Sequence, residues 1–191
     1  MWRIEGFLVA IILFLSFSFS ALSAVPEYNL NKEKSTLKFY AINNNAPVEG
    51  EFKDFSADIK FDKDNLKESS IKVEVKTSSV FAEYEELVSN LVSSDWLSVK
   101  EFPEAVFVSK TISRMPDTEN YYSDGELSLR GKTVPVTLNF QLKFIGSDKI
   151  LATGQATLRR SDFGIGQGEW AKDDVLKDEV RVQFRVMAVR K

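Results

Sequence analysis

The sequence predicts an all-β protein: a closed or nearly closed antiparallel β-barrel of about eight strands with one helical plug. Three observations support this prediction. One long segment alternates apolar and polar residues without a break, several shorter segments repeat the same alternation, and a single stretch shows helical spacing instead.

The longest alternating segment covers residues 134–144. Its apolar positions are Val134, Val136, Leu138, Phe140, Leu142 and Phe144. A period of two places them on one face of a strand, with Thr137, Asn139 and Lys143 on the other. At about 3.3 Å per residue the strand would span roughly 36 Å, about twice the usual length. This length favours a barrel over a β-sandwich, and a wide enough barrel would be lined by the apolar face.

Shorter segments with the same period indicate the remaining strands. They include residues 37–39, 57–61, 71–75, 105–108, 126–129, 156–158 and 180–187. Turn-forming residues separate many of them, among them Gly131-Lys132 and Gly146-Ser147-Asp148. Short turns between successive strands are typical of a meander barrel.

The first 24 residues have the pattern of a signal peptide. Phe7 to Phe19 is an apolar stretch, shorter than a membrane span, and Ala21-Leu22-Ser23 provides small residues for cleavage before or after Ala24. We therefore expect residues 1–24 to be removed on export to the periplasm or beyond, with no membrane span left afterwards. An uncleaved membrane anchor is the alternative. The chain has no Cys, so no lipid can be attached at a lipobox.

Composition limits the chemistry of the remaining single domain, residues 25–191. The net charge of −3 gives no reason to expect binding to nucleic acid. The chain has no His and no Cys, which removes the usual metal ligands and nucleophile pairs. We expect no metal, no cofactor and no catalysis. The core must form without disulfides, and 15 Phe residues are available for it.

Helical spacing appears once, at Tyr84, Leu87, Val88 and Leu91. This segment predicts an amphipathic helix between two strands. It could be a plain plug at one end of the barrel, with Trp96 in the core. It could also be a lid, with Trp96 against a ligand.

Four segments together resemble a known family. They are residues 50–59, Phe102-Pro103-Glu104-Ala105-Val106-Phe107, the hairpin at residues 125–136, and Arg160-Ser161-Asp162-Phe163-Gly164-Ile165. In this order they are similar to the YceI-like family of exported, lipocalin-like barrels that bind polyisoprenoids and other long-chain lipids. Many relatives carry a His near the first strand and another in the helix. Here residues 34–36 and 89–91 stand at those places without one.

Candidate ligand-binding residues follow from the inward faces and the motifs. The apolar candidates are Phe39, Phe52, Trp96, Phe107, Leu129, Phe140 and Phe163. Each could instead simply fill the core. Arg160, with Arg130 and Asp162, could contact a polar head group, or an Arg–Asp pair could fix a corner of the barrel. Gly164, Gly166 and Gly168 predict a bend or bulge in a strand.

The function expected from these features is carriage or sequestration of a long-chain isoprenoid or fatty ligand inside the barrel. One alternative is a filled barrel that acts as a structural or stress-response interaction protein. Another is an enzyme that uses Arg160 and carboxylates. An open edge between the first and last strands could also pair in a homodimer.

Overall fold

The computed structural model describes residues 24–171 and 176–191 and consists mainly of strands. The predicted signal peptide lies outside the described residues, except for Ala24. The strands are β1 (Glu27–Leu30), β2 (Thr36–Asn43), β3 (Ala46–Phe52), β4 (Phe55–Lys60), β5 (Ser70–Lys76), β6 (Val80–Ala82), β7 (Glu104–Arg114), β8 (Asn120–Leu129), β9 (Lys132–Ile145), β10 (Lys149–Arg159) and β11 (Glu179–Arg190). The helix is α1 (Glu85–Val92), and the short 3-10 turns are η1 (Lys32–Lys34), η2 (Leu66–Glu68), η3 (Thr77–Ser79), η4 (Arg160–Phe163) and η5 (Gly168–Ala171).

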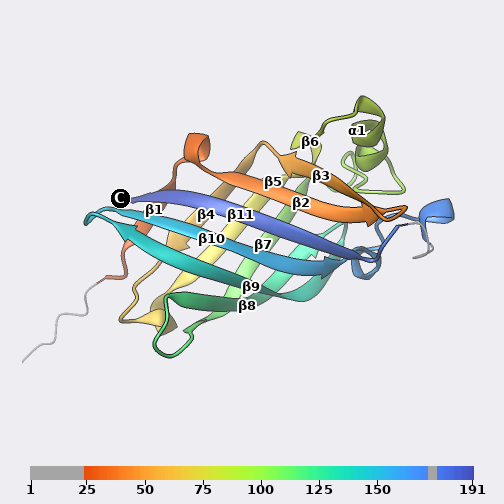
Figure 1. Ribbon diagram of the computed structural model, residues 1–191. Helices are drawn as coiled ribbons and strands as arrows, with labels where there is room; N and C mark the ends of the chain where they lie inside the picture. The colour runs from red at the N-terminus through yellow and green to blue at the C-terminus, as the bar shows by residue number, and fades with distance from the viewer. Residues whose placement is uncertain (1–23, 172–175) are drawn as a thin grey trace, which may run out of the picture.

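The strands form one antiparallel sheet that closes on itself (Figure 1). β1 and β2 act as one interrupted strand, as do β3 and β4, and likewise β5 and β6, so the closed barrel has eight strands, as predicted. Closure occurs where β1 pairs with β11, for example Tyr28 with Arg190. The expected open edge between the first and last strands is therefore wrong, because these two strands pair with each other.

The predicted alternation of β9 is confirmed along most of its length. Val136, Phe140 and Leu142 are buried, whereas the intervening polar residues are exposed. Phe144 is the exception and is 40% exposed. β9 runs beyond the packed end of the barrel into its hairpin with β10, so the last inward position has nothing to cover it. The predicted inward face therefore ends at Leu142.

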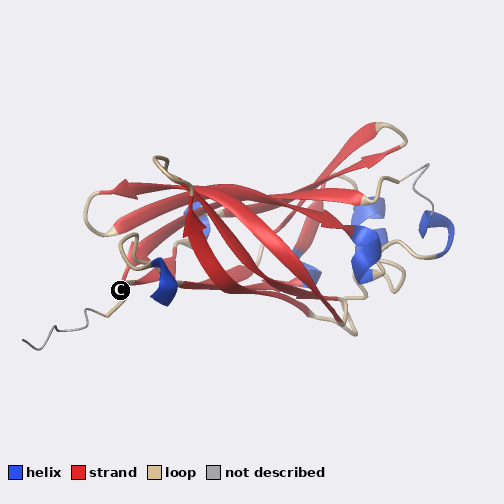
Figure 2. Cartoon of the chain, turned by 90° about the horizontal axis from the view of Figure 1, so that it is seen from below, coloured by secondary structure: helices blue, strands red, loops and turns tan. Residues whose placement is uncertain are grey.

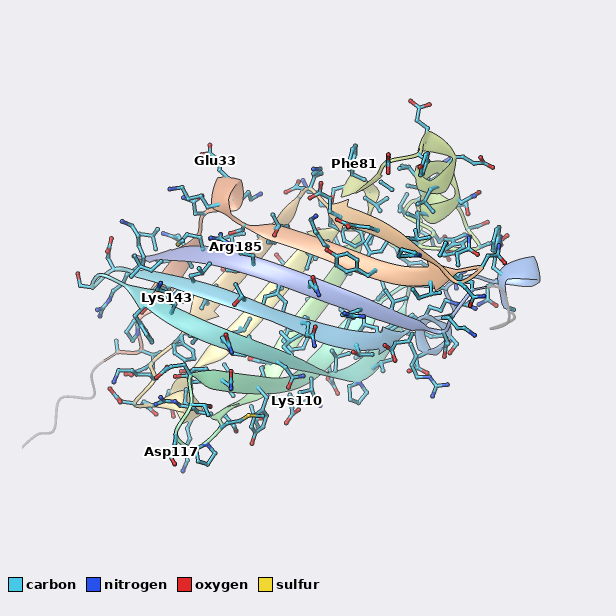
Figure 3. All side chains as sticks on the ribbon, viewed as in Figure 1. Glu33, Phe81, Lys110, Asp117, Lys143 and Arg185 are labelled. Carbon is cyan, nitrogen blue, oxygen red and sulfur yellow. The ribbon has the colours of Figure 1, made fainter. Side chains whose placement is uncertain are left out.

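The outer surface carries most of the charged residues. Figure 3 shows Lys110, Lys143 and Arg185 projecting away from the barrel, and all three are exposed. Most ion pairs between described residues lie on this outer face, such as Lys38 with Glu49 at 2.5 Å. Exposed pairs of this kind contribute little to stability.

Helix α1 covers one end of the barrel (Figure 2). Its residue Leu91 is buried, and Leu87 and Val88 pack against Val80 and Leu97. Tyr84 does not belong to this apolar face, contrary to the prediction. The helix begins at Glu85, so Tyr84 is an extended N-cap residue and is 67% exposed.

Candidate ligand-binding cavity

The barrel interior contains an inner chamber of about 200 Å³. All of the side chains that line it are apolar, from Phe61 and Ile150 at one end to Phe52 and Leu97 at the other. Alternation on nearly every strand of the barrel produces this lining, because each strand turns its apolar face inward. The chamber can hold hydrocarbon and offers no side-chain hydrogen bond to it.

An outer chamber of about 450 Å³ lies between the inner chamber and α1. Its lining includes Asn43, Glu86, Asn90 and Arg160 among apolar side chains. Tyr84, Glu86 and Asn90 are exposed, so the outer chamber opens to solvent beside α1. The two chambers adjoin, because they share part of their lining. The shared residues are Phe52, Leu97, Leu129, Leu158 and Val182.

All eight candidate residues named from the sequence line one or both of these chambers. Phe107 and Phe140 line the inner chamber; Phe39, Trp96, Arg160 and Phe163 line the outer chamber; Phe52 and Leu129 line both. That these side chains contact a ligand remains a prediction. Trp96 packs against the α1 cluster and also lines the outer chamber, so its contact with a ligand, like the lid role of α1, stays a prediction.

Glycines on the strands make room for phenylalanine rings along the barrel wall. In three places a side chain added at an inward-facing glycine would collide with the ring of a phenylalanine on the next strand. The pairs are Gly50 with Phe39, Gly125 with Phe107, and Gly154 with Phe184. Each ring occupies the space above its glycine and so lies along the wall. The barrel is therefore not filled, although its aromatic content would have sufficed.

Arg160 fixes a corner of the barrel through backbone carbonyl groups. It is 5% exposed and donates hydrogen bonds to the carbonyl oxygens of Ile165, Gly166, Lys177 and Leu176. Asp162 is exposed and is not the partner that the sequence suggested. Arg160 thus lines the outer chamber with its guanidinium already engaged, which makes it a structural residue first.

The carboxylate at this corner is Asp178. It accepts hydrogen bonds from the Ser161 amide at 2.9 Å and the Ser161 hydroxyl at 2.8 Å, and it pairs with Arg159. Partial burial opposes ionisation of Asp178, but these hydrogen bonds and the Arg159 charge outweigh it and lower its pKa. The carboxylate is therefore ionised at neutral pH and anchors η4.

Arg130 connects the turn after β8 to the loop that contains Gly164 and Gly166, next to the outer chamber. Arg130 donates to the Gly164 carbonyl at 2.7 Å and the Ser94 carbonyl at 2.6 Å, linking the turn after β8 to two loops. Gly164 and Gly166 have positive φ and lie in a loop after η4. The predicted strand bulge is wrong, because the chain leaves the sheet at Arg160.

The candidate list from the sequence missed several aromatic residues of the cavity, among them Phe55, Phe61, Phe184 and Trp170. Phe61 lines the inner chamber and continues the alternation of Ala57 and Ile59, so the period of two was the available signal. Trp170 lines the outer chamber, with its ring centroid 5.8 Å from that of Trp96. No pattern in the sequence predicts this contact, because Trp96 and Trp170 lie in separate segments outside the strands.

Neither a cluster of potential metal ligands nor a membrane-spanning helix is found among the described residues. Residues 24–171 and 176–191 contain no cluster of three or more acidic side chains that could hold a metal ion. Among the same residues, no helix is both long and apolar enough to span a bilayer.

With this geometry in place, comparisons with known proteins agree on the family. The sequence profile of the YceI-like domain matches residues 28–188. The chain belongs to the YceI-like family. A UPF0312 protein of Pseudomonas putida is 32% identical over 143 residues, which cover 71% of this chain and 72% of the relative.

Solved structures show the same fold. Burkholderia cenocepacia BcnA superposes with a TM-score of 0.79 and 28% identity, covering 83% of this chain and 98% of BcnA. A polyisoprenoid-binding domain from Saccharophagus degradans gives a TM-score of 0.69 over 86% of this chain and 98% of that domain. At 12% identity the second likeness concerns the fold alone. Family membership and the apolar cavity together indicate a binding protein rather than an enzyme.

Proposed function

We propose that this YceI-like protein is an exported carrier that holds one long-chain apolar ligand, a polyisoprenoid or another long-chain lipid. The observation that carries the proposal is the inner chamber, whose lining is apolar throughout. Burial of each CH₂ group contributes about 0.8 kcal/mol, so such a chamber binds a hydrocarbon chain without any specific polar contact.

The polarity of the two chambers also supports an orientation. The inner chamber suits the tail, while the outer chamber offers Asn43, Asn90 and Glu86 to a head group. The side-chain oxygen of Asn43 is buried and lacks a hydrogen-bond partner among the described residues. A buried amide without a partner is costly, so a head group that bonds to it would be favoured.

Export is supported by the signal-peptide pattern of residues 1–24. A periplasmic or secreted carrier would receive its ligand through the opening beside α1. A homodimer remains a prediction, now without the strand edge on which it was based.

The test is native mass spectrometry of the exported protein, followed by organic extraction and identification of any lipid. We expect a stoichiometric long-chain ligand. Phe140→Asp places a charge in the inner chamber and should abolish retention. Asn139→Asp, on the exposed face of the same strand, is the matched control and should retain the ligand.

The contrary result is equally clear. A ligand-free mass, together with refusal of added prenyl and fatty chains, would overturn the carrier function. An interaction protein that acts through its outer face would then be the better interpretation.

A further inference from the structure

The end of the inner chamber opposite α1 is closed by a solid apolar floor. The floor is a cluster of eight buried residues, none more than 7% exposed. Four of them line the chamber, namely Phe61, Phe140, Leu142 and Ile150. The other four lie behind this layer, namely Tyr28, Ile112, Tyr121 and Ala188.

Three aromatic rings form the centre of the floor. Tyr121 stacks on Phe140 with centroids 5.7 Å apart, and it meets Phe61 edge-on at 5.5 Å. Tyr121 itself is 1% exposed, and the guanidinium of Arg114 lies 5.7 Å from its ring. Aromatic contacts of this geometry stabilise the fold by more than the burial of their surface alone. A close-packed interior also deforms little when a ligand presses against it.

A hydrocarbon chain that enters beside α1 must therefore stop at this layer. We propose that Phe61, supported from behind by Tyr121, sets the maximum tail length that the barrel accepts. This inference rests on the proposed carrier function and specifies which ligands it selects. Phe61 is a specificity-determining residue in this role.

The floor gives binding a characteristic dependence on chain length. Each added methylene that enters the inner chamber should strengthen binding about fourfold. Once the tail meets Phe61, further methylenes must remain in the outer chamber or in water, and the gain per carbon should fall sharply. Affinity plotted against chain length should therefore show a break.

The experiment uses the mature protein and straight-chain fatty acids lengthened by two carbons at a time. Trp96 and Trp170 both line the outer chamber, and the remaining tryptophan, Trp2, belongs to the predicted signal peptide. Intrinsic fluorescence of the mature chain therefore reports events in that chamber. Dissociation constants across the series locate the break.

Two variants should move the break in opposite directions. Phe61→Ala leaves a space that the surrounding structure fills only in part, so the break should move to longer chains by about three carbons. Ala152→Leu adds bulk beside the floor, because Ala152 lines the inner chamber and packs against the floor cluster, and it should move the break to shorter chains. Phe102→Ala is the matched control, since Phe102 is half-buried outside both chambers.

The outcomes separate this inference from the carrier function. If the wild-type protein binds the series but the break stays in place in both variants, each folded by circular dichroism, Phe61 does not set the length. If Phe61→Ala does not fold, Phe61→Leu and Ala152→Leu decide the question. If the wild-type protein binds no chain of any length, the carrier function itself fails and this inference fails with it.

Discussion

Gly154 provides a sharp test of why the barrel is hollow. A methyl group at this position would lie 2.5 Å from Cζ of Phe184 and 2.6 Å from Cβ of Phe140, and would also collide with the Asn139 carbonyl oxygen. Two of these neighbours line the inner chamber. Gly154→Ala must therefore push the Phe184 ring off the wall and into the chamber, or strain the pairing of β9 with β10.

Overpacking of this kind costs about 1–3 kcal/mol. For a domain of this size that corresponds to a decrease in Tm of roughly 2–12 °C. If the displaced ring removes room for about two methylenes, binding of a long fatty acid should weaken roughly fifteenfold. Thermal unfolding by circular dichroism and tryptophan fluorescence titration measure the two effects.

A double-mutant cycle identifies the cause. Phe184→Leu removes the ring that the new methyl group displaces, so Gly154→Ala/Phe184→Leu should recover part of the lost Tm relative to the sum of the single changes. Thr153→Ala, at the exposed neighbouring position, should leave Tm and affinity nearly unchanged. The reasoning is refuted if Gly154→Ala matches the wild-type protein in both measurements, or if the effects of the two changes simply add.

Two further predictions concern Arg160 and pH. Arg160→Lys removes the planar group that donates to several carbonyls at once and should lower stability by about 2–4 kcal/mol, seen as a lower Tm; an unchanged Tm would show that the corner does not depend on it. Because the chain has no His, no side chain has an ordinary pKa between 5 and 8, and the urea midpoint should be flat from about pH 6 to 8. Hydrogen-bonded pairs with Lys191 and Lys60 lower the pKa of Glu27 to about 2 from the model-compound value of 4.5. Ionised Glu27 therefore stabilises the folded state fully above pH 4.5, and this stabilisation is lost as the pH falls through the folded-state pKa of about 2. The midpoint should accordingly decrease in acid, less so in high salt, and a step near pH 6.5 would contradict this account.

Much of the fold follows from local sequence. The period of two along β9 determines which residues face inward, because alternate side chains of any strand point to opposite faces. The same rule placed Phe140 and Phe107 in the interior and would have placed Phe61 there. The single stretch with helical spacing likewise predicted α1, although its first turn starts one residue later than the pattern suggested.

The tertiary structure decided what the interior contains. Whether inward phenylalanines fill the barrel or lie on its wall depends on the register between strands, which brings Gly154 opposite Phe184 and Gly50 opposite Phe39. Arg160 donates to the backbone carbonyls of Ile165, Gly166, Leu176 and Lys177, which no side-chain pattern can encode. A sequence specifies the direction of each side chain locally, whereas a cavity, its floor and its opening arise only where distant strands meet.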